Sequence, residues 1–425
     1  MIAWLLISFF VLLFLGVPIA MSLGLSAIGG ILFLGGGSTV TIAQRMFEGM
    51  NSFALLAIPL YTFAGFTMSK GGISKRLMDF CYSIVGHIYG GLAHVNVLSS
   101  MIFAGISGSA VADTAGVSGM FMPEMIRKGY SKNFTVAVTA ISSTIGIIIP
   151  PSIPMVVIAG ICGISTGKLF LGGIIPGILC GLAQMIVSYF LAKKEGVPKE
   201  PGHFTIGPVL HGLWESWPAL LMPIIIVGTI TMGIVSPTEA GVIAVVYGLF
   251  AGGIIYRELK WEDIKFAFAE TVRTSGRIFI VIGAAKLYTV MLTTAGFDKW
   301  VAKTMLGFST NPTVILIVIL LIFFIVTMFM ESIATLTLFM PILYPIALGV
   351  GINPIVLSVL ITVVIGIGLV TPPVGMCIYV ACDLMDTTVG EVFPTLVPFI
   401  AATFVCIALM VAFPQLILLP TYLMA

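Results

Sequence analysis

Residues 106–154 read ISGSAVADTAGVSGMFMPEMIRKGYSKNFTVAVTAISSTIGIIIPPSIP, and this stretch decides the fold. Small polar residues and one carboxylate, Asp113, stand inside otherwise apolar sequence. A helix is expected to run towards Gly146 and to end at Pro150-Pro151, because proline lacks an amide proton and clashes with the preceding turn. The stretch therefore predicts a hydrophobic helix that is interrupted part of the way along.

The same phrase returns near the end of the chain. Gly146-Ile-Ile-Ile-Pro150-Pro151 corresponds to Gly368-Leu-Val-Thr371-Pro372-Pro373 at a distance of 222 residues, close to half of the 425-residue chain. Broken hydrophobic helices at matching places in two halves point to the binding site of a secondary transporter. We therefore predict an all-α polytopic membrane protein built from two repeats, residues 1–200 and 201–425.

The composition is typical of a protein that resides in a lipid bilayer. Hydrophobic residues make up 59% of the chain and charged residues only 8%, against about 25% charged in a soluble domain. The net charge of +2 is spread along the chain without a basic stripe, so no nucleic-acid partner is expected. The apolar start at Met1 lacks a basic region and a cleavage site, which favours a membrane segment over a removable signal peptide.

Each predicted half contains the same kinds of element. An amphipathic arm is expected over 39–51 and a second over 257–275. The glycines and serines around residue 108 suit a re-entrant hairpin, whose backbone is exposed only where protein or trapped water can satisfy it. The predicted hairpins cover 102–125 and 314–345, and the predicted broken helices cover 134–162 and 356–382. The loops 193–211 and 257–277 carry eight of the 19 Lys and Arg residues, so both are expected on the cytoplasmic side.

Broken helices provide a way to bind ions. A break frees backbone carbonyls that can replace the water around Na⁺, and a helix N-terminus presents N–H groups to an anion. Each half offers one break and one hairpin tip, so we expect two roughly equivalent Na⁺ sites. The alternative is that these glycines and prolines only kink helices or allow close packing.

The candidate ligands follow from these positions. For Na⁺ they are Ser107, Gly108, Ser109, Asp113, Gly146, Ile149 and Pro150 in the first half, and Glu331, Ser332, Gly366, Gly368, Thr371 and Pro372 in the second. For the substrate they are Ser107, Ser109, Pro151, Ser152, Ser332, Thr335 and Pro373.

Charged residues inside apolar segments cost a few kcal/mol on insertion scales. Asp113 and Glu331 are therefore interpreted as ion ligands, proton carriers or partners of a cation, the alternative being an interfacial place at a helix end. That alternative is favoured for Asp383 and Asp386, because a turn follows them. Lys286 can pair with a carboxylate or an acidic substrate, or extend to the interface.

An enzyme is not expected. The sequence around Ser107 resembles the start of a Gly-x-Ser-x-Gly elbow, but residue 109 is serine rather than glycine. The four histidines show no metal-ligand spacing, and the six cysteines stand in apolar surroundings without a C-x-x-C pair.

Several motifs together are specific. They are Leu55-Leu-Ala-Ile-Pro59-Leu, Ala104-Gly-Ile-Ser-Gly-Ser-Ala-Val-Ala-Asp113-Thr, Met122-Pro-Glu-Met, Ser143-Thr-Ile-Gly146 with Pro150-Pro-Ser-Ile-Pro154, Pro237-Thr-Glu-Ala240 and Thr371-Pro-Pro-Val-Gly375. Over nearly the whole chain this set resembles the DctM-like large membrane subunit of tripartite ATP-independent periplasmic (TRAP) transporters. One departure is Glu331, where many members of the family would have Asp.

The resemblance implies a multi-pass protein of the bacterial inner membrane, a Na⁺ symporter with inverted repeats and the elevator mechanism of the ion-transporter superfamily. It implies two partners, a small four-helix membrane subunit (Q-type), expected as a separate polypeptide, and a periplasmic substrate-binding protein (P-type). The expected substrate is a carboxylated solute such as sialic acid or a C4-dicarboxylate. The alternative is a self-sufficient Na⁺/dicarboxylate symporter that needs no binding protein.

Overall fold

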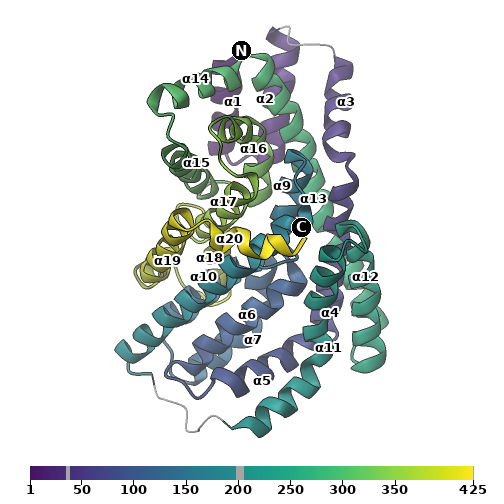
Figure 1. Cartoon of the computed structure of the whole chain (residues 1–425), viewed down its shortest axis with the longest axis vertical. Coiled ribbons are helices and arrows are strands. Elements are labelled where there is room, and N and C mark those ends of the chain that lie inside the picture. The colour runs from purple at the N-terminus through teal and green to yellow at the C-terminus, as the bar shows by residue number, and fades with distance from the viewer. Residues whose placement is uncertain (35–38, 198–204, 425) are drawn as a thin grey trace.

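The computed structural model describes residues 1–34, 39–197 and 205–424, and in these ranges the chain is helical and contains no β-strand (Figure 1). The helices of the first half are α1 (Ile2–Phe14), α2 (Ile19–Leu34), α3 (Thr39–Met50), α4 (Ala57–Lys70), α5 (Ile73–Val85), α6 (Gly91–Ser107), α7 (Ala110–Arg127), α8 (Lys132–Ser143), α9 (Ile153–Cys162) and α10 (Thr166–Lys194). Those of the second half are α11 (Ile206–Thr231), α12 (Pro237–Phe250), α13 (Trp261–Thr294), α14 (Phe297–Phe308), α15 (Pro312–Thr327), α16 (Ser332–Gly349), α17 (Pro354–Gly368), α18 (Met376–Asp383), α19 (Val389–Ala412) and α20 (Gln415–Leu418).

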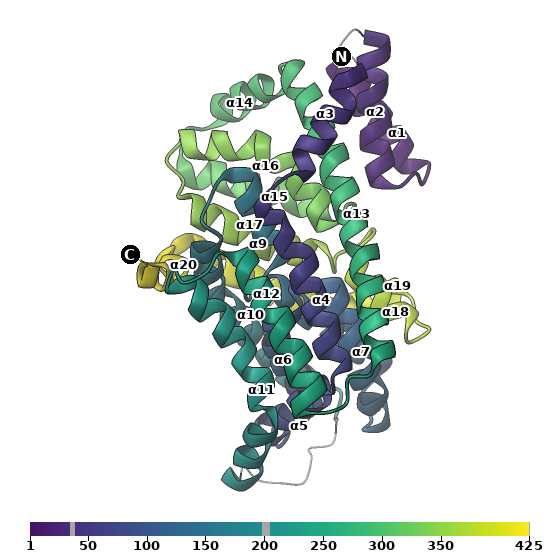
Figure 2. The ribbon, with the colours of Figure 1, turned by 90° about the vertical axis from the view of Figure 1, so that its right-hand side faces the viewer.

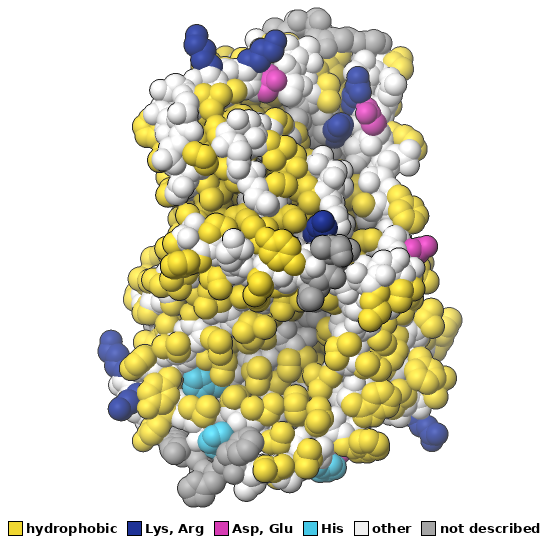
Figure 3. Space-filling view, viewed as in Figure 1, with side chains coloured by type: hydrophobic (Ala, Val, Ile, Leu, Met, Phe, Trp, Pro, Cys, Tyr) yellow, Lys and Arg dark blue, Asp and Glu magenta, His cyan; other side chains and the backbone are white. Residues whose placement is uncertain are grey.

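Within the described ranges, seven helical segments are long and apolar enough to cross a membrane. The face drawn in Figure 3 carries a broad band of hydrophobic side chains, and most of its charged side chains lie above or below that band. Side chains in contact with lipid need no polar groups, whereas charged groups favour the two aqueous sides. These features indicate a multi-pass membrane protein.

Two pairs of consecutive helices, α6 with α7 and α15 with α16, are each joined by a short turn. In the first unit α6 meets α7 at residues 107–109, here called the first tip, where Gly108 has a φ of +64° that favours glycine. In the second unit α15 meets α16 at residues 328–331, here called the second tip. The first unit is longer than the predicted 102–125. Its first helix begins at Gly91, because Gly90 has a φ of +74° and ends the turn after α5.

Both proline pairs interrupt a helix, as predicted. After α8 a short 3-10 turn, Thr144–Ile147, leads to residues 148–152, here called the first break, and α9 then begins. The second break, residues 369–375, separates α17 from α18. The Pro150-Pro151 and Pro372-Pro373 peptides are both cis.

One predicted boundary on the arms is wrong. Residues 261–277 form no loop or separate arm, because they are the first half of the continuous helix α13. Arg273 lies inside that helix and forms an ion pair with Glu270, with 2.6 Å between Arg273 Nη1 and Glu270 Oε1. The helix α13 lies beside α3 and α4 along much of the molecule (Figure 2).

The two halves share one apolar core. Its largest cluster of buried residues runs from Leu55 to Ile417 and includes members of α8, α10, α17 and α19, which contact one another. The predicted boundary between residues 200 and 201 lies outside the described residues. Because the two halves pack against each other around this core, both tips and both breaks belong to one packed domain.

Candidate functional site

The first tip and the first break meet at a buried carboxylate. Asp113 lies in the first turn of α7 and is fully buried. The Ser107 hydroxyl donates a hydrogen bond to Asp113 Oδ1. A Cβ built on Gly146 would lie 2.2 Å from Asp113 Oδ2, so only glycine leaves room for this oxygen. Ser109 caps α7, because its side chain accepts the N–H of Ala112. The structure therefore brings together four predicted site residues, Ser107, Ser109, Asp113 and Gly146.

A backbone hydrogen bond joins the first tip to the start of α9. The N–H of Ile153 donates to the carbonyl of Gly108 at 3.2 Å. A Cβ on Gly108 would lie 2.7 Å from the Pro151 carbonyl oxygen, so the tip and the break are in direct contact. The Ser152 hydroxyl donates to the Ile147 carbonyl at 2.5 Å and accepts the N–H of Met155, which caps α9.

The second tip and the second break repeat this contact. The N–H of Val374 donates to the carbonyl of Met328 at 3.0 Å. A Cβ on Gly368 would lie 2.0 Å from the Thr327 hydroxyl oxygen, where its counterpart Gly146 faces a carboxylate. Thr327 was not among the predicted residues. Its only sequence signal is that it is the last polar residue of an apolar helix before the tip.

Glu331 has a different role from Asp113. It is the N-cap of α16, where its carboxylate accepts the N–H of Ile333 at 3.2 Å and the Ser332 hydroxyl at 3.1 Å. The Thr335 hydroxyl donates to the Glu331 carbonyl at 3.1 Å, and the Thr371 hydroxyl donates to the carbonyl of Ile367 at 2.7 Å. These predicted ligands therefore lie close to the second tip and break, with their hydroxyl protons already donated.

The two broken helices also touch each other. A Cβ on Gly366 would lie 3.2 Å from Thr144 Cβ and 3.7 Å from Ile147 Cδ1, so α17 crosses the turn that follows α8. The Ile149 side chain fills the space beside Gly177 of α10. Pro150, Pro372 and Pro373 lie in the breaks themselves. Asp383, the last residue of α18, and Asp386 in the turn that follows are both exposed.

The first tip has the chemistry of a cation site. Asp113 Oδ2 has no hydrogen-bond partner among the described residues, although it is buried. The Ser109 carbonyl faces the same space, 3.6 Å from where a Cβ on Gly146 would stand. A small hard cation prefers carboxylate, hydroxyl and carbonyl oxygens, and a buried carboxylate is costly without such a partner. The arrangement can therefore hold a cation next to the first break.

Comparison with known proteins identifies relatives. Residues 6–416 match the sequence model of a family described as tripartite ATP-independent periplasmic transporter, DctM component. The chain is 35% identical to the sialic acid TRAP transporter large permease protein SiaM of Vibrio cholerae, over 96% of this chain and 95% of that protein. It is 35% identical to the C4-dicarboxylate TRAP transporter large permease protein DctM of Pseudomonas aeruginosa, over 95% and 94%.

Two further similarities extend this picture. The chain is 37% identical to the isethionate TRAP transporter permease protein DctMQ of Oleidesulfovibrio alaskensis, over 92% of this chain, and spans 62% of that protein's length. Its fold is similar to that of the Alcanivorax borkumensis YdaH transporter, with a TM-score of 0.60, 13% identity and 86% of each chain covered.

Proposed function

Because the chain belongs to the family of DctM components of tripartite ATP-independent periplasmic transporters, we propose that it is the large membrane subunit of a Na⁺-driven importer for a carboxylated solute. It is a transporter permease component and not an enzyme. We place it in the bacterial inner membrane.

The observation that carries the Na⁺ proposal is the unpartnered carboxylate oxygen at the first tip. Asp113 Oδ2 is buried against Gly146 and needs a positive partner, while Ser107 already donates to the other oxygen. Na⁺ bound by this oxygen and nearby carbonyls would complete the site. The second tip would hold Na⁺ through backbone carbonyls and hydroxyl oxygens, because a hydroxyl that donates its proton to a carbonyl keeps its lone pairs for a cation.

The two halves act as inverted repeats in this proposal. Corresponding helices start about 222 residues apart, as Ala110 and Ser332 of α7 and α16 do, and as Lys132 and Pro354 of α8 and α17 do. A backbone hydrogen bond ties the first tip to the start of α9, directly after the first break, and another ties the second tip to the second break, so the tips and breaks would move together. The helices α3, α4 and α13 would form the stationary scaffold of an elevator.

The substrate and partners are proposed from the relatives. Those compared above are named for sialic acid, C4-dicarboxylates and isethionate, and all three are organic acids. We favour sialic acid or a C4-dicarboxylate. A periplasmic binding protein would deliver the acid, and a small four-helix subunit would complete the membrane complex.

Uptake by proteoliposomes tests the proposal. The chain and its small subunit are reconstituted together, and uptake of radiolabelled sialic acid and succinate is followed with and without an inward Na⁺ gradient and the binding protein. Uptake that needs both Na⁺ and the binding protein supports the proposal. Uptake with Na⁺ alone supports the self-sufficient symporter, and uptake that ignores the Na⁺ gradient contradicts Na⁺ coupling.

A further inference from the structure

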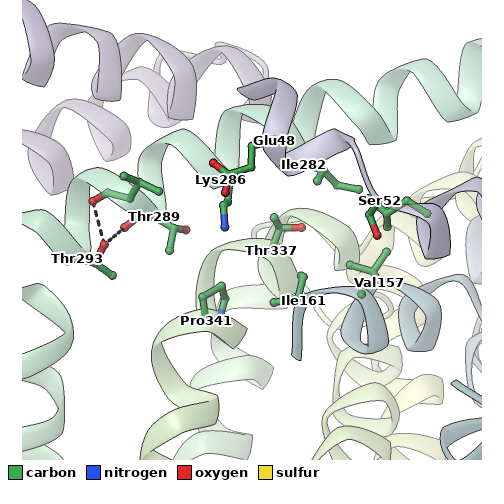
Figure 4. A pocket seen from close by; sticks show the side chains of 14 residues that line it. Glu48, Ser52, Val157, Ile161, Ile282, Lys286, Thr289, Thr293, Thr337 and Pro341 are labelled. Atoms are coloured by element: carbon green, nitrogen blue, oxygen red, sulfur yellow. Dashed lines mark hydrogen bonds between the residues drawn. The ribbon is translucent and has the colours of Figure 1, made fainter. Parts of the chain in front are cut away.

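A cavity of about 310 Å³ lies between α3 and α13 on one side and, on the other, α9, which follows the first break, and α16, which follows the second tip (Figure 4). Its size is at the lower end of the range for small-molecule sites. Its lining comes from α3 and α13 on one side and from α9 and α16 on the other. Val157 on the lining is one helical turn beyond Ile153, the residue that is hydrogen-bonded to the first tip.

One cation points into this cavity. Figure 4 shows the Lys286 ammonium directed towards the space bounded by Thr337, Pro341 and Ile161. Lys286 lies in α13, a helix that is apolar enough to span the membrane, where a charged side chain normally has a functional partner. Among the described residues no ion pair with Lys286 is present.

One acid lies close enough to Lys286 to be attracted by its charge. Glu48 is also on the lining, but its carboxylate pairs with Arg45 at 2.7 Å. Arg45 lies outside the lining, and with it counted, Arg45, Glu48 and Lys286 together carry one net positive charge. That charge matches one carboxylate or sulfonate group of an organic acid.

A hydroxyl group beside the lysine has no partner. Thr289 is one turn along α13 from Lys286, is buried and lines the cavity. Its Oγ1 makes no hydrogen bond to any described residue, whereas the neighbouring hydroxyl of Thr293 donates to the carbonyls of Thr289 and Val290. A buried hydroxyl without a partner is unfavourable, so a ligand oxygen next to it would be stabilised.

We propose that this cavity binds the acidic group of the transported solute, with Lys286 pairing with the carboxylate or sulfonate and Thr289 donating a hydrogen bond to it. This inference rests on the proposed function and assigns a substrate contact to the arm α13, outside both tips. Since α9 and α16 form the opposite wall, the acid would contact α13 and the helices that follow the first break and the second tip at once. Movement of α9 and α16 past α13 would then change the distance between the two walls that hold the acid.

Direct binding to the full-length chain in lipid nanodiscs tests the proposal. Isothermal titration calorimetry measures sialic acid, succinate and isethionate, with succinamide as the uncharged counterpart of succinate. Lys286→Gln is expected to weaken binding of the best acid about 10- to 100-fold, the effect of losing one hydrogen bond to a charged group. Thr289→Val is expected to weaken it about 2- to 10-fold.

Two variants serve as controls. Lys286→Arg keeps the charge and should retain most of the affinity. Lys265→Gln removes the same charge from an exposed position of α13, where Lys265 pairs with Glu262 at 3.0 Å, and should bind like the wild type.

Equal affinity of Lys286→Gln and the wild type would overturn the proposal, as would a wild-type chain that binds none of the three acids. Neither result affects Na⁺-driven uptake measured in proteoliposomes. Failure of the cavity and failure of the transport function are therefore distinguishable.

Discussion

At the scale of single residues, Asp113 and Glu331 show how similar side chains receive different roles. Both stand near a tip, but Glu331 caps its own helix while Asp113 is held one turn inside α7 by Ser107. A helix cap satisfies a carboxylate through backbone N–H groups. Asp113 lacks that solution for its second oxygen, so it is the residue that most needs a cation.

Replacing Asp113 by Asn should therefore weaken Na⁺ coupling. The substitution preserves the shape of the side chain and removes its charge, so the Na⁺ concentration for half-maximal uptake is expected to rise about tenfold or more. The measurement is uptake into proteoliposomes at a series of external Na⁺ concentrations. Glu124→Gln is the matched control, because Glu124 lies on the same helix and pairs with Arg127 at the surface. An unchanged Na⁺ dependence in Asp113→Asn would rule out this role.

At the scale of elements, close approach of the tips to the breaks depends on two glycines. A methyl group on Gly146 or Gly368 would overlap Asp113 or Thr327. Gly146→Ala and Gly368→Ala are each expected to destabilise the protein by about 1–3 kcal/mol, the usual effect of overpacking. Thermal unfolding of the purified chain measures this effect. Gly228→Ala provides the control, since no atom lies within 4 Å of the added carbon, and equal unfolding temperatures for all three variants would refute the close contact.

A buried polar network joins α6 to α8. The Asn96 amide donates to the Thr139 hydroxyl at 2.7 Å and accepts from the Ser142 hydroxyl at 3.0 Å. Asn96→Ala removes both hydrogen bonds and should cost about 1–2 kcal/mol, which a lower unfolding temperature would register. Thr304→Val, at an exposed position of α14, should leave that temperature nearly unchanged. A stable Asn96→Ala variant would show that the network contributes little.

At the scale of the whole molecule, an elevator requires α9 to move past the arm. A Cβ on Gly160 of α9 would lie 3.8 Å from the Ser52 hydroxyl oxygen, which is compatible with a disulfide between cysteines at these positions. Oxidising the Ser52→Cys/Gly160→Cys variant should stop uptake, and reduction should restore it. Each single variant is the control for oxidation of the six native cysteines. Full uptake by the cross-linked protein would exclude relative motion at this contact.

The sequence predicts those features that depend on neighbouring residues. Both helix breaks follow from the covalent chemistry of proline, and the capping box of Ser236 and Glu239 at the start of α12 follows from their spacing. Residues 39–50 also form the helix predicted there. The start of α6 and the continuity of α13 were predicted wrongly, because turn geometry at Gly90 and packing of α13 against α3 and α4 decide them.

By itself, then, the sequence determined an all-helical membrane protein with two matching broken helices, because hydrophobicity and backbone restrictions act over a few residues. Only the tertiary structure decided which atoms meet at the tips. Thr327 lies 41 residues from Gly368, and Lys286 reaches a cavity whose far wall begins at Val157. Such partners are selected by packing between distant helices, and no local pattern encodes the direction in which Ile149 or Asp113 points.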